Sequence, residues 1–573
     1  MFIPTTSKEL KQRGWSQCDV ILITGDTYID SPHIGIAVVG KVLINAGFRV
    51  GIIAQPDISS DELTRLGEPK LFWGVTAGSV DSLVANYTAT KKFRKRDDYT
   101  PGGTNNRRPD RASIIYSNLI RRYFKNTKPI ALGGVEVSLR RIAHYDYWSD
   151  KIRRSILFDA KADYLLYGMA EKTILEFSRL LKDGKDPSQL RGLCYISASP
   201  PPEYIEVPPF DQVKTDKRAF INMFHTFYRN NDPLNASGLI QKTDNRYLVQ
   251  NPPQYYLSQK ELDDVYNLDF ERAVHPFYAK HGNVKALDTI RFSITTHRGC
   301  YGECNFCAIG IHEGRTVRWR NASSIIKEVE HLTHDPSFKG YISDIGGPTA
   351  NMYGFECRKK LDEGACKDKR CIYPEICPLL PVNHQTQTRL LQRLRKIPGI
   401  KKVFVGSGIR HDLVMNDKSH GQQYLKEVVN HHTSGQLKIA PEHSEKRVLN
   451  KMAKTGADLL LEFKNRFDTY SAQAGKKQYL TYYFIAAHPG CSEEDMRALR
   501  SFAVRELRIY PEQIQIFTPT PATYSSLMYY TEMDPFTMES LFVEKLQKQK
   551  DVQKNILVAK PRTSATKRKR KNG

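Results

Sequence analysis

The sequence lacks the features of a secreted or membrane-spanning protein. Residues 1–15 show no charged segment followed by an apolar one, which is the pattern of a signal peptide. No apolar run approaches the ~20 residues that a membrane-spanning helix needs. Acidic residues are also scarce relative to basic ones, with 62 Asp and Glu against 86 Lys and Arg. We therefore expect a cytoplasmic protein that has no membrane partner.

The shortage of acidic residues leaves a net charge of +24. Such a charge favours polyanionic partners, of which nucleic acid is the commonest, and a solvated basic surface is the alternative. Two runs concentrate the charge, KKFRKR at 91–96 and KRKRK at 567–571. The second run lies in a basic tail, residues 531–573, which lacks apolar periodicity and which we expect to be disordered.

Cysteine is present, and its spacing indicates metal ligation rather than disulfides, because no secretory signal accompanies it. Cys300, Cys304 and Cys307 lie in HRGCYGECNFCAIG, residues 297–310, which we call the cysteine loop. Three thiolates can hold a 4Fe–4S cluster and leave one iron open. The C-x-x-x-C-x-x-C spacing, with Phe306 before the last cysteine, resembles the signature of radical S-adenosylmethionine (SAM) enzymes. The alternative is a zinc knuckle, whose cysteines usually come in C-x-x-C pairs.

Residues 1–195 alternate between apolar runs and helical periodicity, which predicts a Rossmann-like α/β domain with a parallel sheet. The predicted strands begin at residues 18, 50, 71, 129 and 163, and helices lie between them. The ligand site of such a domain lies at the carboxyl ends of the strands. The candidates there are Asp26, Asp30, His33, Gly133 and Gly134.

Radical SAM enzymes that bind cobalamin carry a domain of this shape in this position. Some cobalamin proteins supply a cobalt ligand from the motif Asp-x-His-x-x-Gly. Here the letters are Asp30-Ser-Pro-His33-Ile-Gly35, which differ by one residue on each side of the histidine. We therefore expect a supporting domain, with cobalamin binding as the less favoured alternative.

Residues 196–286 are rich in proline and aromatic residues, and we expect them to form a connector that wraps the flanking domains. Residues 287–530 then alternate strand and helix signals six times, which predicts a partial (β/α)6 barrel. The chemistry of such barrels lies at the carboxyl ends of the strands, and the cysteine loop follows the first strand.

Polar residues and glycines stand at the later strand ends of this barrel. By resemblance to radical SAM enzymes, the glycines would meet the SAM amino group, an arginine its carboxylate, and an acidic residue its ribose hydroxyls. Each could also be an ordinary turn residue. The candidate SAM-binding residues are Gly346, Gly347, Ser407, Arg410 and Glu442. A Pro-Gly turn after His488 ends the fifth strand and would lie near the adenine.

A second cysteine group lies in an insertion at residues 355–380, after the second strand. The segment is polar, and a metal bound by four thiolates would hold it together. A structural zinc or iron–sulfur site is the favoured interpretation, an auxiliary cluster the alternative, and unligated thiols the remaining one. Its members are Cys357, Cys366, Cys371 and Cys377.

Several long strings closely resemble the YgiQ-type radical SAM proteins, among them LFWGVTAG, YTPGGTNNRRPDRA, SDIGGPTANMYGFEC and VGSGIRHDL. The resemblance covers residues 2–540. It implies a 4Fe–4S cluster, SAM, and reductive cleavage of SAM to a 5′-deoxyadenosyl radical, with a reductant such as a flavodoxin or ferredoxin as partner. The family has no assigned substrate, and the charge favours RNA or another nucleic acid. The competing hypothesis is a nucleic-acid-binding protein with a structural cluster.

Overall fold

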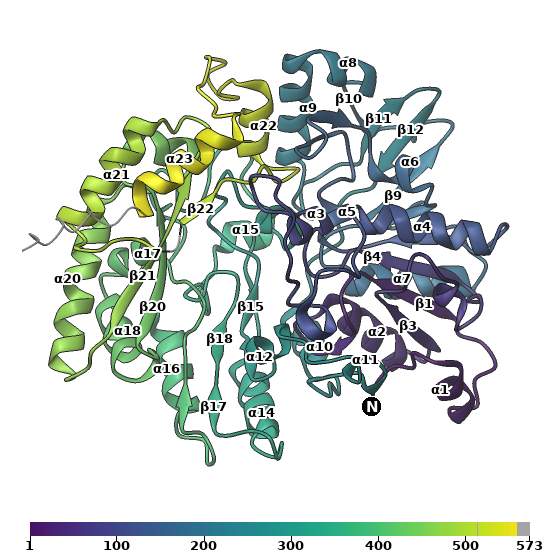
Figure 1. Cartoon of the computed structure of the whole chain (residues 1–573), viewed down its shortest axis with the longest axis horizontal. Coiled ribbons are helices and arrows are strands. Elements are labelled where there is room, and N and C mark those ends of the chain that lie inside the picture. Colours follow the sequence, from purple (N-terminus) through teal and green to yellow (C-terminus); the bar gives the residue numbers. More distant parts are fainter. Residues whose placement is uncertain (513, 559–573) are drawn as a thin grey trace, which may run out of the picture.

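The computed structural model in Figure 1 describes residues 1–512 and 514–558 of the chain. Two halves lie side by side, the N-terminal one in purple to blue and the C-terminal one in green to yellow. The basic run at 567–571 lies outside the described residues. Within them, we find no helix with the length and apolar character that crossing a membrane requires.

A nine-stranded sheet organises the N-terminal half. Its strands, in spatial order, are β10 (Ile205–Val207), β11 (Leu239–Thr243), β12 (Arg246–Gln250), β9 (Leu193–Ser197), β8 (Tyr164–Leu166), β5 (Ile130–Leu132), β4 (Phe72–Thr76), β1 (Val20–Thr24) and β3 (Val50–Ala54). The last five are mutually parallel. In chain order they run 2-1-3-4-5, a flavodoxin-like order that switches direction between β1 and β4. The predicted α/β class with a parallel sheet is confirmed.

The parallel strands are buried on both faces because helices cover each side. Alternate residues of β1 enter two separate cores, Ile21 and Ile23 in one, and Val20 and Leu22 in the other. Two helix pairs pack together over the sheet: α2 (Gly35–Asn45) with α7 (Glu171–Lys182), and α4 (Ala112–Tyr123) with α6 (Ile156–Ala160). Shorter elements are α1 (Ser7–Gln12), α3 (Ser82–Asn86), α5 (Val135–Ser138), β2 (Ile29–Asp30) and the β6–β7 hairpin (His144–Asp146, Lys151–Arg153).

The region predicted as a connector differs from the expectation. The expected boundary at residue 195 falls inside β9, and residues 196–286 add three strands to the sheet. β9 and β12 pair in antiparallel fashion, as do β12 and β11. These strands are only three to five residues long, and prolines flank them, so the sequence signal was weak. The region also contains α8 (Phe210–Thr215), α9 (Lys217–Arg229), α10 (Gln259–Tyr266), β13 (Ala273–Val274) and α11 (Pro276–Ala279).

The six strand segments that the sequence predicts for the C-terminal half form in its described part. They are β14 (Ser293–Thr295), β17–β18 (Tyr341–Ile342, Asp344–Gly346), β19 (Lys402–Val403), β20 (Gln436–Glu442), β21 (Tyr479–Ala486) and β22 (Ile514–Ile516). Every pairing is parallel: β14 with β18, β17 with β19, β20 with β21, and β21 with β22. A parallel bridge from Ile409 to Ile439 joins the two groups. Spatial order therefore follows chain order.

Helices separate these strands and bury one apolar core between themselves and the strands. They are α14 (Ala322–Leu332), α16 (Gln385–Leu394), α17 (His411–Asn416), α18 (Gly421–Glu427), α19 (Lys446–Met452), α20 (Asp458–Gln473) and α21 (Glu493–Arg505). Short pieces complete this half: α12 (Ala286–Ile290), β15 (His297–Arg298), α13 (Ile309–His312), β16 (Arg318–Trp319) and α15 (Arg358–Glu363).

The beginning of the predicted disordered tail is folded. After α22 (Tyr524–Thr531) the chain forms α23 (Gln547–Val558), which packs against α21. The Gln553 side chain accepts a hydrogen bond from Ala487 N at 2.9 Å and donates one to Cys491 O at 3.1 Å. The buried face of α23 carries Lys550 and Gln553 beside Leu557. Polar residues at these positions hid the helical period from a hydrophobicity-based interpretation.

Candidate functional site

The cysteine loop begins at the carboxyl end of β14. Cys300, Cys304 and Cys307 are all partly buried there. Gly302 N donates to Cys300 Sγ at 3.3 Å, and Cys307 N donates to Cys304 O at 3.0 Å. Burial raises the pKa of the Cys300 and Cys307 thiols. The three cysteines thus face a common, partly enclosed region at one strand end.

The conformation of this loop depends on Gly299 and Glu303. Gly299 has φ +79°, and a Cβ there would lie 2.5 Å from Thr316 O, so only glycine fits. Glu303, between the first two cysteines, has φ +46° and is buried. Its carboxylate lies 3.2 Å from Arg315 Nη1 and 3.8 Å from Lys360 Nζ. A buried carboxylate held by two cations fixes the turn that carries the cysteines.

The end of β18 approaches the loop closely. A Cβ on Gly347 would lie 2.6 Å from both Nε2 and the carbonyl oxygen of His297, at the start of the cysteine loop. Gly346 accepts a hydrogen bond from Thr296 N at 2.7 Å. The structure therefore places both predicted glycines against the backbone that leads into the cysteines.

Ser407 and Arg410 follow β19, but both have partners within the chain. Ser407 Oγ donates to the carboxylate of Asp344, which also accepts from Ser407 N at 2.9 Å. Arg410 forms two parallel hydrogen bonds to Asp412, one of them from Nε at 2.9 Å. The two-bond geometry that we expected Arg410 to offer a SAM carboxylate is thus taken by Asp412. Its remaining nitrogen, Nη1, lies 3.7 Å from Cys304 Sγ.

The ends of β20 and β21 face the same region. Glu442 is buried with φ +68°, and its Oε1 lies 3.7 Å from Lys454 Nζ. Burial raises the pKa of the Glu442 carboxyl, although Lys454 and Arg410 oppose this. His488 packs edge-on against Phe306 of the cysteine loop, with ring centroids 6.4 Å apart. The strand ends predicted from sequence therefore do gather around the loop.

A buried network of hydrogen bonds holds the backbone at Arg410 in place. Arg410 N donates to Asn351 Oδ1 at 2.7 Å, and the Asn351 amide lies 3.2 Å from His384 Nε2. His384 Nδ1 in turn lies 2.9 Å from Asp417. Burial alone would raise the pKa of the Asp417 carboxyl, but hydrogen bonds from the His384 ring and backbone lower it to about 2.

This network should weaken in acid. The pKa of Asp417 lies below that of an unfolded aspartate, so the ionised carboxylate stabilises the fold above about pH 4. We expect a loss of about 2 kcal/mol in the free energy of unfolding as the pH falls toward 2. Urea unfolding at about pH 6 and about pH 2 measures it. In Asp417→Asn the difference between the two pH values should shrink by this amount, and an unchanged difference would contradict the assignment.

The second cysteine group is divided between a small apolar core and the partly exposed surface. Among the described residues, no group of three or more His, Cys, Asp or Glu side chains gathers as ligands of one ion. In a cubane cluster each thiolate binds a different iron, so the cysteine loop does not need that arrangement. Cys357 and Cys371 instead enter a small apolar core with Tyr301 and Phe355, and Cys366 and Cys377 are partly exposed. The sequence did not reveal these core contacts to the cysteine loop, and a metal on the four cysteines stays a prediction.

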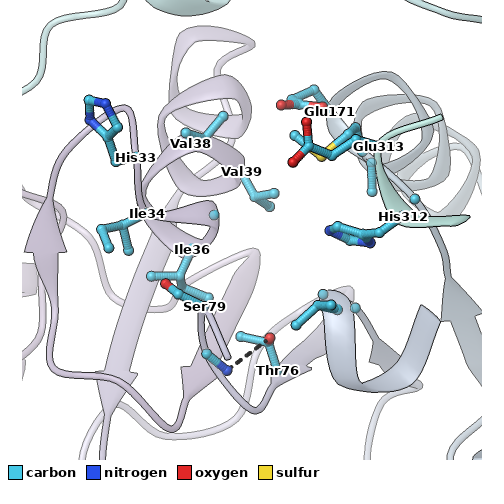
Figure 2. A pocket seen from close by; sticks show the side chains of 18 of the residues that line it. His33, Ile34, Ile36, Val38, Val39, Thr76, Ser79, Glu171, His312 and Glu313 are labelled. Carbon is cyan, nitrogen blue, oxygen red and sulfur yellow. Dashed lines mark hydrogen bonds between the residues drawn. The ribbon is translucent and has the colours of Figure 1, made fainter. Parts of the chain in front are cut away.

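A cavity of about 600 Å³ lies between the two halves (Figure 2). It occupies the carboxyl ends of β1, β4, β5 and β8, the edge where the sequence predicts a ligand site. Apolar groups dominate the sheet side, and Gly133 and Gly134 leave room there. The opposite wall comes from the cysteine loop and its continuation, through Thr295, His297, Arg298, Ala308, Ile309, His312 and Glu313.

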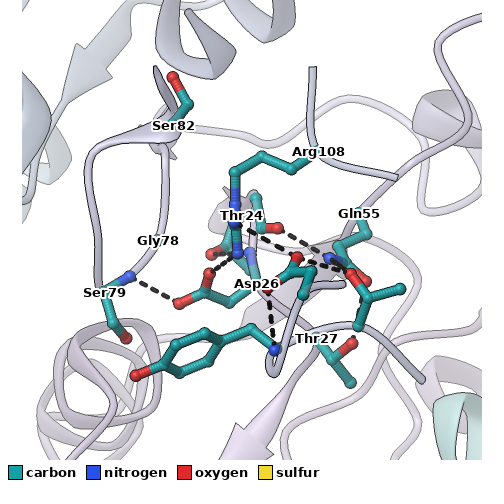
Figure 3. Close-up of polar contacts among 12 residues, drawn as sticks. Thr24, Asp26, Thr27, Gln55, Gly78, Ser79, Ser82 and Arg108 are labelled. Atoms are coloured by element: carbon teal, nitrogen blue, oxygen red, sulfur yellow. Dashed lines mark hydrogen bonds and ion pairs between the residues drawn. The ribbon is translucent and has the colours of Figure 1, made fainter. Parts of the chain in front are cut away.

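The acidic candidates of the N-terminal half have structural partners. Asp26 lies 2.6 Å from Arg108 Nη2 and accepts a hydrogen bond from Ser79 N at 2.6 Å (Figure 3). Burial raises the pKa of the Asp26 carboxyl despite this arginine. Asp30 is buried, and its Oδ2 lies 3.0 Å from Lys41 Nζ, which occupies that oxygen as an ion-pair partner. The Asp26 contacts join the turns after β1 and β4 at the switch point, and the Asp30 pair joins β2 to α2.

His33 is at the rim of the cavity rather than at its centre (Figure 2). Its two ring nitrogens lie 3.4 Å from Ser31 Oγ and 3.3 Å from Thr295 Oγ1. Burial lowers the pKa of His33 to about 4, so the ring is neutral at pH 7. The histidine therefore joins β2 to β14, as a residue between the halves.

Sequence reasoning missed the polar end of the cavity. His312, Glu313 and Glu171 point into it from the right in Figure 2. Glu171 binds Arg298 Nη1 at 2.6 Å through one oxygen, while its other oxygen is buried without a partner among the described residues. Glu313 accepts from Gly299 N at 3.0 Å. The sequence signal for His312 and Glu313 was the HEG string at 312–314, which begins five residues after Cys307.

Known proteins resemble this chain in sequence over nearly its whole length. The family described as "Radical SAM N-terminal" matches residues 2–293. The UPF0313 protein of Fusobacterium nucleatum subsp. nucleatum is 57% identical over 561 residues, which are 98% of this chain and 99% of that protein. That of Thermotoga neapolitana is 50% identical over 567 residues, again 98% and 99% of the two chains.

Two solved structures share the fold at low identity. The radical SAM methyltransferase TsrM from Kitasatospora setae, with cobalamin and a [4Fe-4S] cluster bound, has a TM-score of 0.50 at 14% identity, covering 90% of this chain and 78% of that one. The cobalamin-dependent SAM radical enzyme OxsB, with aqua-cobalamin bound, has a TM-score of 0.50 at 12% identity, covering 92% and 57%. The family match and the close relatives show that the chain belongs to the radical SAM family, among its UPF0313 proteins.

Proposed function

We propose that this protein is a radical SAM enzyme in which Cys300, Cys304 and Cys307 bind a 4Fe–4S cluster at the end of β14. The observation that carries the proposal is the position of these cysteines, on a buried loop ringed by the ends of β18, β19, β20 and β21. The proposed fold of this half is the partial (β/α)6 barrel. When bound, the cluster and SAM supply one-electron chemistry that yields a 5′-deoxyadenosyl radical.

The residues of the chain would hold SAM in the following way. Gly346 and Gly347 would let the end of β18 pack against the backbone that leads into the cysteines, beside the amino acid part of SAM, because no side chain intervenes. Glu442, a buried carboxylate, accepts hydrogen bonds from the ribose hydroxyls. Arg410 keeps its pair with Asp412 and presents only Nη1 toward Cys304, where it compensates negative charge on the cluster. Ser407 supports the turn through Asp344 rather than by touching SAM.

The cavity between the halves favours a further bound group, and cobalamin is the group carried by TsrM and OxsB. The apolar strand ends and the two glycines suit a large flat ligand. The segment at 30–35 does not suit a cobalt ligand, because both ring nitrogens of His33 already have hydroxyl partners. We therefore assign no step of the reaction to cobalamin.

One experiment on anaerobically purified protein tests these assignments together. Iron, sulfide, zinc and cobalt are quantified, and the reduced protein is then incubated with SAM. From the cysteine loop we expect about four irons per chain and formation of 5′-deoxyadenosine, without stoichiometric cobalt, and one zinc or a second set of four irons would be held by the second cysteine group. About eight irons would identify the second cysteine group as a cluster site. An intact cluster without SAM binding or cleavage would favour a nucleic-acid-binding protein with a structural cluster.

A further inference from the structure

An exposed loop rich in Lys and Arg follows, along the chain, residues that line the cavity. The chain leaves the cavity after β4 at Gly78 and Ser79, passes through α3, and reaches residues 88–96, which we call the basic loop. Every residue from 91 to 96 is exposed, and five of these six are Lys or Arg. None of the nine residues of the loop is acidic. The cations are exposed to solvent, although Lys92 pairs with Asp551, and Lys91 and Arg94 also donate to backbone carbonyls.

The backbone of the basic loop is held in place. Thr88 N donates to Lys92 O at 2.8 Å, and Arg94 N donates to Asn86 O at 2.7 Å. Lys92 reaches Asp551 of α23 at 3.2 Å, an exposed contact between the two halves. In Figure 1, α3 accordingly lies where the two halves meet. The basic loop therefore lies where the two halves meet, and the cavity lies between the same two halves.

Aromatic rings accompany the charges. Phe93 is 56% exposed although it is a large apolar residue. It packs edge-on against Tyr87, with ring centroids 5.7 Å apart, and Tyr87 lies 5.5 Å from Trp148. Lys91 lies over the Tyr147 ring, 4.7 Å from its centroid. An exposed ring on an aromatic support, flanked by cations, offers a face on which a base can stack.

We propose that the basic loop is a binding site for single-stranded nucleic acid. Phosphates are attracted by Lys91, Arg94, Lys95 and Arg96, and one base stacks on Phe93. An acidic protein partner would use the cations but would not explain an exposed phenylalanine at their centre. That the bound strand is also the substrate rests on the proposed radical SAM function, whereas the binding itself does not.

Fluorescence anisotropy with a labelled single-stranded RNA of roughly 16 nucleotides tests the binding. If four phosphates are neutralised, a plot of the log of the association constant against the log of the salt concentration should have a slope of about −3. A fourfold rise in salt concentration would then weaken binding about 50-fold. Replacing Lys91, Arg94, Lys95 and Arg96 with glutamine should remove most of this slope. Phe93→Ala should weaken binding roughly tenfold and leave the slope unchanged, because stacking releases no counterions.

The matched control removes the same charge elsewhere. Lys339, Lys396, Lys401 and Lys402 are exposed near the amino-terminal ends of β17 and β19, away from the cavity. Their replacement by glutamine should leave RNA binding nearly unchanged. Equal losses in the control and loop variants would overturn the site, as would absence of binding at low salt. Tighter binding of polyglutamate than of RNA would instead assign the loop to an acidic protein.

SAM cleavage in the absence of RNA separates this proposal from the proposed function. The loop variants should keep the rate of the unaltered protein, since the basic loop contributes nothing to the cysteine loop. Normal RNA binding without any SAM cleavage would contradict the enzyme and leave the binding site intact. Normal SAM cleavage without RNA binding would do the reverse.

Discussion

Cys304→Ala should abolish the formation of 5′-deoxyadenosine from SAM. Its thiolate is the middle one of the three, and its loss leaves a second iron without a protein ligand. The iron content of the anaerobically purified variant should fall well below about four per chain. Iron and sulfide analysis, together with the visible absorption of the cluster, measures the loss independently of activity.

Cys194→Ala is the matched control. This thiol is fully buried in β9 of the N-terminal sheet and is not part of the cysteine loop. The control should keep its iron and its SAM cleavage, at a modest cost in stability. A Cys304→Ala protein that retains iron and full activity would refute the ligand assignment.

Asp412→Asn should cost about 3 kcal/mol or more in the free energy of unfolding. The substitution keeps the shape of the side chain but removes the charge that compensates Arg410. Both side chains are buried, 9% and 1% exposed, so the guanidinium would remain in the protein interior without its carboxylate. The Arg410 guanidinium holds the pKa of Asp412 well below its usual range, although burial acts in the opposite direction. Urea unfolding measures the effect.

An exposed pair gives the comparison for this substitution. Arg358 and Asp362 lie 3.6 Å apart on α15, with side chains 94% and 65% exposed. Asp362→Asn should change the free energy of unfolding by less than about 0.5 kcal/mol, because water screens the pair. Similar losses in both variants would show that Asp412 contributes no more to the free energy of unfolding than an exposed aspartate does.

The strand positions of both halves followed from the sequence, because parallel strands buried on two faces read as continuous apolar runs. CDVILIT and VGIIA are examples, and both form strands of the sheet. The strands at 205–207, 239–243 and 246–250 did not, since they are short, partly polar and bounded by prolines. Their place in the sheet depends on pairing with β9, a long-range contact that no local pattern encodes.

The candidate site was predictable in position and less so in detail. Glycines and charged residues at strand ends identified the neighbourhood of Gly347 and Glu442. The partner of Arg410 was not identified, although Asp412 stands only two residues away in the sequence. A local carboxylate competes with any external ligand for a guanidinium, and only the three-dimensional geometry shows which one wins. Glu171, 127 residues from its partner Arg298, left no local signal at all.

The ion pair between Glu171 and Arg298 connects the cavity physically to the cysteine loop. Glu171 lines the cavity from the N-terminal half, and Arg298 stands two residues before Cys300. A ligand that alters this pair changes the affinity of the loop for its cofactor by some factor. Linkage requires that the cofactor change the affinity of the cavity for that ligand by the same factor. Occupancy of one site therefore changes the binding affinity of the other by the same factor in both directions.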